Sequence, residues 1–299
     1  MDEYGVGSHL SWRLLIDLAL MWRVRQIGEN CLRRVCDWSV LDGGMVGGMI
    51  ENICVPTGFA DFGSADVRVR YRGNDGRFAD TTLRQLPIGD VLDGLPVREF
   101  RSYKGRLHYS GWYWSSTTGA HLVYESRLEL ARLLVADHDP SVVAIAAQPF
   151  LLEGPDGERV RRHVPDLLLA HADGAVTVVD VKAPSRAGDP AVAAQFAWTE
   201  KLCGLRGFGF QVWTGADPVV LENLRFLAGY RRPMTVRADL AAAVLQTAVA
   251  PVSLAALERG LAGTASPSLI RPVVLGLLWQ SRLRADLARR LGGDTVVAA

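Results

Sequence analysis

Three charged residues lie in the two apolar segments of residues 163–184, which read HVPDLLLAHADGAVTVVDVKAP. Asp166, Asp180 and Lys182 lie in two Leu- and Val-rich segments that are typical of buried strands. Ala172-Asp173-Gly174 predicts a tight turn between them, with the glycine in the left-handed conformation. This turn pairs residues whose numbers add to about 346, so Asp166 faces Asp180 across the hairpin. Lys182 then shares their face, and the other face of the sheet is expected to be the apolar one.

Two opposed carboxylates repel each other, and a divalent cation between them removes that conflict. Oxygen ligands at this spacing suit Mg²⁺ or Mn²⁺ better than zinc. Such an ion lowers the pKa of a bound water and binds a phosphate oxygen, while Lys182 can orient the water or stabilise the transition state. The pattern therefore predicts phosphodiester hydrolysis. The alternative is a set of solvated charges on an amphipathic sheet.

A third carboxylate is expected from a helix predicted over residues 119–136, which begins after Gly119 and ends before Asp139-Pro140. Glu125 would lie one turn into this helix, beside its apolar stripe. Glu129 is the competing choice.

The elements around these residues follow the order helix, three strands, helix, strand. A strand over 142–152 precedes the hairpin. Within residues 185–205 a helix is predicted to start near Asp189-Pro190, and it precedes a strand over 208–215. A hairpin with Asn74-Asp75-Gly76 at its turn lies upstream. The order predicts an α/β core whose mixed β-sheet is flanked by helices.

The C-terminal part of the chain predicts a different unit. Helical patterns over 238–249, 252–261 and 267–282 precede two short strands around Gly292-Gly293, which indicates a winged helix-turn-helix. The third helix has an apolar middle, VVLGLLW, so a partner-binding or mixed role is favoured over a helix that reads DNA. The predicted division is an extension of unclear role at 1–65, a core domain at 66–219 and a winged-helix-like domain at 220–299.

Composition sets outer limits on the class of protein. The 299 residues carry a formal net charge of +1, which excludes a uniformly basic nucleic-acid coat but allows a local basic patch. The apolar stretch at 11–25 contains four charged residues, so it predicts an amphipathic helix and no membrane span. Four cysteines without a CxxC pair favour reduced thiols in a cytoplasmic protein.

The sequence also offers candidate accessory residues and DNA-contacting residues for the hairpin site, and its signal for them is weaker than for the three charged residues. Gln148 and Gln195 could reach it from the neighbouring strand and helix, although structural amides are an alternative for both. DNA contacts are expected from basic residues that lie among aromatics or beside the hairpin: Arg101, Lys104, Arg106, Arg161 and Arg162. The aromatics could equally fill a core, and Arg161 and Arg162 could equally belong to a solvated turn.

Together these residues resemble a known pattern. Pro165-Asp166 followed by Asp180-Val181-Lys182 resembles the PD-(D/E)xK motif of restriction-endonuclease-like nucleases, with Glu125 as the preceding acid. Over residues 96–215, segments such as YESRLELARLL, AQPF, RRHVPDLLL and VVDVKAP are similar to the TnsA-like endonuclease subunits of heteromeric transposases.

The resemblance implies an Mg²⁺-dependent endonuclease, with Mn²⁺ as a substitute, that cuts one strand at transposon ends. It also implies a separate DDE-type transposase and an AAA+ ATPase regulator as partners. Glu125, Asp166 and Lys182 match the family's active-site members, and Asp180 stands where the family has Gln or another polar ligand. The alternatives are a stand-alone restriction or repair nuclease and a non-catalytic adaptor that docks DNA or protein.

Overall fold

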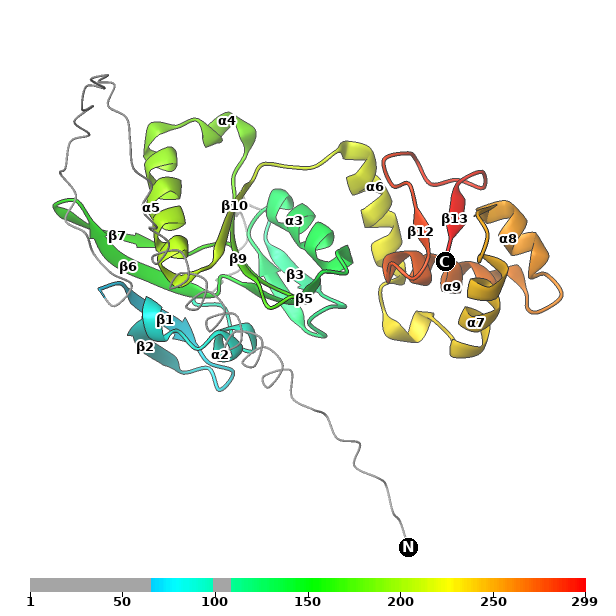
Figure 1. The fold of residues 1–299 in the computed structure, drawn as a ribbon, viewed down its shortest axis with the longest axis horizontal. Helices are drawn as coiled ribbons and strands as arrows, with labels where there is room; N and C mark the ends of the chain where they lie inside the picture. The colour runs from blue at the N-terminus through cyan, green and yellow to red at the C-terminus, as the bar shows by residue number, and fades with distance from the viewer. Residues whose placement is uncertain (1–65, 99–108) are drawn as a thin grey trace, which may run out of the picture.

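The computed structural model describes residues 66–98 and 109–299, and these form a mixed α/β fold (Figure 1). This confirms the predicted fold class at that level. The segment 1–65 and the basic residues Arg101, Lys104 and Arg106 lie outside the described residues. In the described ranges, no helix is both long enough and apolar enough to cross a membrane.

The central sheet has the strand order β10-β9-β8-β5. Its strands are β5 (Val142–Ala147), β8 (Leu167–His171), β9 (Val176–Val181) and β10 (Gly209–Trp213). Strand β8 is antiparallel to both β5 and β9, whereas β10 is parallel to β9. Helices α3 (Arg127–His138) and α5 (Pro190–Arg206) lie on opposite sides of this sheet (Figure 1). The predicted mixed sheet flanked by helices is therefore present.

Both faces of the central sheet are buried. Leu167 and Val179 join the cluster that includes α3, whereas Leu168 and Val178 join the cluster that includes Trp198 of α5. All four strand residues are at most 1% exposed. The prediction of one apolar and one charged face is therefore wrong, because a helix covers each face. The charges lie instead where the strands end.

The predicted register of the β8–β9 hairpin is confirmed along the ladder. Leu167 pairs with Val179 and Ala170 with Val176, so the paired numbers add to 346, and Gly174 has φ +82°. The ladder stops at Leu167, however. The Asp166 N–H donates to the Val179 carbonyl at 3.1 Å, so Asp166 and Asp180 do not form the expected opposed pair.

A second antiparallel sheet has the order β2-β1-β6-β7. It consists of β1 (Arg68–Arg72), β2 (Phe78–Thr82), β6 (Phe150–Asp156) and β7 (Arg159–His163). After β2 the chain forms η1 (Leu83–Gln85) and α2 (Ile88–Leu92). The single strand predicted over 142–152 is wrong. The chain leaves the central sheet at Gln148 because residues from Phe150 onward pair with β1.

The helix predicted from residue 119 begins later. Gly119, with φ +70°, lies in the turn of a hairpin formed by β3 (Gly111–Trp114) and β4 (His121–Tyr124). Helix α3 begins after Ser126, whose Oγ accepts a hydrogen bond from the Glu129 N–H at 3.1 Å. The Glu129 carboxylate in turn accepts from the Glu125 N–H at 2.8 Å. Glu125 therefore precedes the helix, and its predicted place one turn inside is wrong.

The chain continues through α4 (Pro184–Ala187) to α5, which begins directly after Asp189. The Asp189 side chain accepts from the Ala191 N–H at 2.9 Å, so the helix start predicted near Asp189-Pro190 is confirmed. Helix α6 (Pro218–Leu227) spans the predicted domain boundary at 219/220. The remaining elements are η2 (Ala228–Tyr230), η3 (Pro233–Thr235), α7 (Ala238–Thr247), β11 (Val252–Ser253), α8 (Leu254–Gly260), α9 (Pro267–Trp279), β12 (Arg284–Ala285) and β13 (Val296–Ala298). Strand β13 lies between β11 and β12 in a small antiparallel sheet.

Helix α9 is the centre of this C-terminal unit. All residues from Val273 to Trp279 are buried. Trp279 Nε1 donates to Ser116 Oγ at 2.8 Å, and the Arg231 guanidinium lies 4.9 Å from the centre of the Tyr113 ring. One hydrophobic cluster runs from α3 to α9. The C-terminal unit therefore packs directly on the α3 side of the core (Figure 1).

Candidate active site

Most of the predicted site residues meet at one end of the central sheet. Gln148 directly follows β5, Asp166 directly precedes β8, and Asp180 and Lys182 lie at the end of β9. Because β8 runs opposite to both neighbours, these positions share one edge of the sheet. The Gln148 N–H donates to the Asp166 carbonyl at 2.8 Å, and the Lys182 N–H donates to the Trp213 carbonyl at 3.0 Å.

Asp166 is the most perturbed carboxyl group at this edge. Its Oδ2 accepts a hydrogen bond from the Val181 N–H at 2.6 Å. Burial is the largest cause that raises the pKa of Asp166, the negative charges of Glu129 and Asp180 add to it, and the Val181 N–H and Lys182 oppose it, so that the pKa is raised to about 7. The site therefore concentrates negative charge that Lys182 only partly offsets.

Glu129 is the helical acid that acts on Asp166. Burial raises the pKa of Glu129, and hydrogen bonds from the Glu125 backbone and the Ser126 hydroxyl oppose that rise. Glu125 has its carboxylate 3.5 Å from the Arg98 guanidinium and contributes no comparable effect to Asp166. The spacing Ser126-x-x-Glu129 is a capping box, so this helix start was readable from the sequence.

Asp180 is held by a histidine that the sequence reasoning missed. Asp180 is 2% exposed, and both of its oxygens lie 2.8 Å from His163 Nε2. His163 Nδ1 lies 2.6 Å from Gln195 Nε2. Because a carboxylate only accepts, Nε2 donates to Asp180, and Nδ1 of a neutral ring accepts from Gln195. Gln195 therefore supports His163, which agrees with the structural amide that the sequence offered beside an accessory role in the site.

The sequence signal for His163 was its strand position. It ends β7 opposite Leu152, whose side chain is buried, so it belongs to the inner face of the second sheet. Its partner Asp180 comes from the other sheet. That contact joins the two sheets beside the site, and only the three-dimensional arrangement reveals it.

The edge of the sheet has the donor chemistry of a magnesium site. Among the described residues, no group of three or more His, Cys, Asp or Glu side chains is placed to hold a metal ion. Mg²⁺, however, is commonly bound by one or two carboxylates together with water and substrate phosphate. Asp166 and Glu129 supply such carboxylates, and their repulsion is what a cation would relieve. The residues therefore fit Mg²⁺. Both Asp180 oxygens contact His163, and both Glu129 oxygens accept hydrogen bonds, from the Glu125 N–H and the Ser126 hydroxyl. A carboxylate has about four lone-pair sites, so each acid retains sites for a cation.

The predicted arginine contacts separate into two kinds. Arg161 has a side chain that is only 13% exposed, and it lies 2.6 Å from the Asp156 carboxylate. Arg162 is 69% exposed and shares the Glu153 carboxylate with Arg68. Arg161 is therefore neutralised internally, and Arg162 remains open to solvent.

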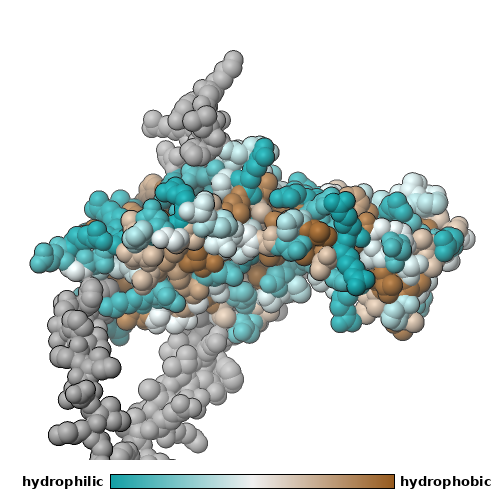
Figure 2. Space-filling model, turned by 90° about the horizontal axis from the view of Figure 1, so that it is seen from above, coloured by the Kyte–Doolittle hydropathy of each residue, from teal (hydrophilic) through white to brown (hydrophobic). Residues whose placement is uncertain are grey.

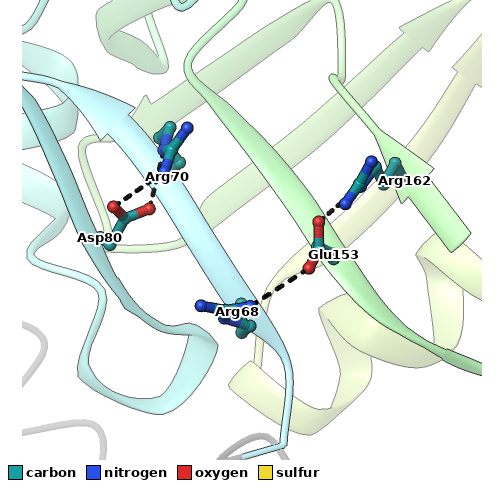
Figure 3. A network of polar contacts seen from close by, with 5 residues as sticks. All are labelled: Arg68, Arg70, Asp80, Glu153 and Arg162. Atoms are coloured by element: carbon teal, nitrogen blue, oxygen red, sulfur yellow. Dashed lines mark hydrogen bonds and ion pairs between the residues drawn. The ribbon is translucent and has the colours of Figure 1, made fainter. Parts of the chain in front are cut away.

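Arg162 belongs to a basic surface on the second sheet, shown in Figure 3. Arg68 and Arg70 of β1 lie beside it, and we call these three residues the arginine face. Their counterions are Glu153 and Asp80. Figure 2 shows that the end of the molecule carrying the β6–β7 hairpin is hydrophilic. The three guanidinium groups are paired with two carboxylates, so the arginine face together with these counterions carries a net positive charge.

No protein-family model matches the chain, and no curated protein matches it.

Proposed function

We propose that this protein is a Mg²⁺-dependent DNA endonuclease that nicks DNA as the TnsA-like subunit of a heteromeric transposase. The observation that carries the proposal is the meeting of Asp166, Glu129 and Lys182 at one end of the central sheet. An acidic pair beside a lysine, at the end of an apolar hairpin, is the constellation that metal-assisted phosphodiester hydrolysis requires.

Each residue has a definite role in this proposal. Mg²⁺ would supply an activated water and charge for the phosphate. Asp166 is held by the Val181 N–H, so its carboxylate is oriented toward the site before any ligand arrives. Glu129 is fixed by Ser126 at the first turn of α3. Lys182 orients the attacking water or stabilises the charge that develops on the phosphate.

Asp180 acts as a positioning residue in the proposed site. With His163 it fixes the end of β9, and Lys182 follows two residues later. The proposal assigns Asp180 to placing Lys182, and it assigns the metal to Asp166 and to Glu129, whose negative charge acts on Asp166 more strongly than that of Asp180. The assignment differs from the expectation that Asp180 is itself a metal ligand.

The finer fold assignment belongs to the same proposal. A restriction-endonuclease-like core is supported by the mixed sheet with an acidic edge between α3 and α5. A winged helix is supported by the order α7, β11, α8, α9, β12, β13. The second half of α9 is buried and therefore not open to read DNA, so we assign the C-terminal unit to partner docking. The DDE-type transposase and the AAA+ ATPase are the partners that the resemblance implies.

DNA would approach the site across the arginine face. β7 carries Arg162 and continues through Val164 and Pro165 into Asp166. Guanidinium groups bind phosphate oxygens without regard to sequence, so this surface can position a duplex beside the cutting site.

One observation favours a non-catalytic adaptor. Asp180 is occupied by His163, and a nuclease fold that only docks DNA would not need a free acid there. Calorimetry with Mn²⁺ separates the two functions, because the nuclease requires cation binding and the adaptor does not.

The proposal is tested by nicking of a labelled duplex that carries a transposon end, in Mg²⁺, with and without a DDE-type transposase of the kind that the resemblance implies. Lys182→Ala should lower nicking by about 100-fold or more with unchanged circular dichroism. Lys201→Ala, on the exposed side of α5, is the matched control and should cut like the wild type. Nicking by Lys182→Ala at the wild-type rate would contradict the mechanism.

A further inference from the structure

Gln148 adopts an unusual backbone conformation where the chain passes from the central sheet to the second sheet. Its φ is +47°, and among the described residues the only other non-glycine with positive φ is Ser281, at +54°. A side chain with a Cβ atom is disfavoured in this region, so the surroundings must hold it there. The backbone bonds to Asp166 and Val97 do so, since the Gln148 carbonyl accepts from the Val97 N–H at 3.1 Å.

The side chain of Gln148 is equally unusual. Gln148 is 2% exposed, and neither its Oε1 nor its Nε2 has a hydrogen-bond partner among the residues that the structure describes. Leaving a buried amide unsatisfied is costly, and methionine would fill the same space without that cost. Backbone strain and an unsatisfied amide therefore coincide at one residue.

The position of this residue connects both features to the candidate site. Along the β5–β8 ladder from Ala144 onward the paired numbers add to 314, ending with Ala147 and Leu167. Gln148 and Asp166 continue this register and are joined by the 2.8 Å hydrogen bond. The backbone of Gln148 therefore contacts the backbone of Asp166 at the edge of the sheet that carries the candidate site.

We infer that the Gln148 carboxamide is a ligand of the divalent cation in this site, with Oε1 binding the hydrated cation beside Asp166. The inference rests on the proposed function and deepens it. Because the proposal assigns Asp180, with His163, to placing Lys182, the site needs another oxygen donor. An amide oxygen coordinates Mg²⁺ without adding negative charge to an edge where Asp166 and Glu129 already repel each other.

The test uses two substitutions that should not harm folding. Gln148→Met keeps the volume and removes the unsatisfied amide, and Gln148→Gly removes the backbone strain. Both should keep or raise the Tm without metal, weaken Mn²⁺ binding in calorimetry by about 10-fold or more, and slow nicking by a similar factor. Ser281→Gly is the matched control, because it relieves the same kind of strain far along the chain and should leave Mn²⁺ affinity and nicking unchanged.

The outcomes separate the inference from the proposed function. If the wild type binds Mn²⁺ but does not nick, the nuclease function fails and the affinities of the Gln148 variants still decide the inference. If both Gln148 variants bind Mn²⁺ within about 2-fold of the wild type, or if both unfold, the amide is structural and the inference is overturned. A wild type that binds no Mn²⁺ overturns it as well.

Discussion

Replacement of Asp166 by asparagine should stabilise the protein at alkaline pH while removing a residue that the proposed chemistry needs. The pKa of Asp166 is raised to about 7, first by burial and then by the nearby carboxylates. In the unfolded chain an aspartate has a pKa of about 3.9. The folded protein therefore holds a proton that the unfolded chain has lost between these pH values, so stability falls as pH rises through this window.

The magnitude follows from the gap between the two pKa values. A gap of about three pH units corresponds to about 4 kcal/mol of lost stability above pH 7. The asparagine in the Asp166→Asn protein would carry no charge, and its Oδ1 can still accept from the Val181 N–H. We expect a gain of about 2–4 kcal/mol at pH 8, since the new amide must find partners of its own. At pH 5 the gain should be less than about half as large.

Urea unfolding of the metal-free protein at both pH values measures this effect. Glu158→Gln, in the exposed turn between β6 and β7, removes one negative charge at a distance from the site and serves as control. An Asp166→Asn protein that is no more stable than the wild type at pH 8 would refute the electrostatic account of the site. Equal gains at pH 5 and pH 8 would refute it too.

Four further variants test separate parts of the protein. Glu129→Gln should slow nicking by about 100-fold, whereas Glu125→Gln should cost less than about 10-fold, and the reverse order in single-turnover rates would restore the original choice of acid. His163→Ala should slow nicking by about 10-fold, because Asp180 loses its partner and Lys182 its support; an unchanged rate would contradict this positioning role. An Arg68→Ala/Arg162→Ala protein should bind duplex DNA more weakly, with the slope of log affinity against log salt reduced by about 2; an unchanged slope would remove the arginine face from the DNA path.

The sequence was sufficient for the part of the site that depends on local geometry. Gly174 fixes the hairpin turn, and the register of β8 and β9 followed from it correctly. The end of that ladder did not follow, because the backbone of Asp166 shifts its hydrogen bond to Val179. Pairing at the end of a strand also depends on the backbone hydrogen bonds of the neighbouring strands, and a prediction made from β8 and β9 alone does not include them.

Other errors came from long-range pairing and from one misread turn. The strand over 142–152 divides at Gln148 because β1, which lies far earlier in the chain, pairs with its second half. Gly119 was interpreted as the residue before a helix, but it closes the β3–β4 hairpin. The Ser126-x-x-Glu129 capping box gave the true helix start and was the stronger local signal. His163 could not be found at all without the contact between the two sheets.

Strand cleavage of a transposon-end duplex is the most direct measurement of the central claim. With the proposed DDE-type transposase partner present, the wild type should nick one strand in Mg²⁺ or Mn²⁺, and a chelator should stop it. Asp166→Asn, although more stable at pH 8, should leave the duplex intact. Nicking that persists in the chelator, or that Asp166→Asn carries out at the wild-type rate, would contradict a metal-dependent endonuclease built on this edge of the sheet.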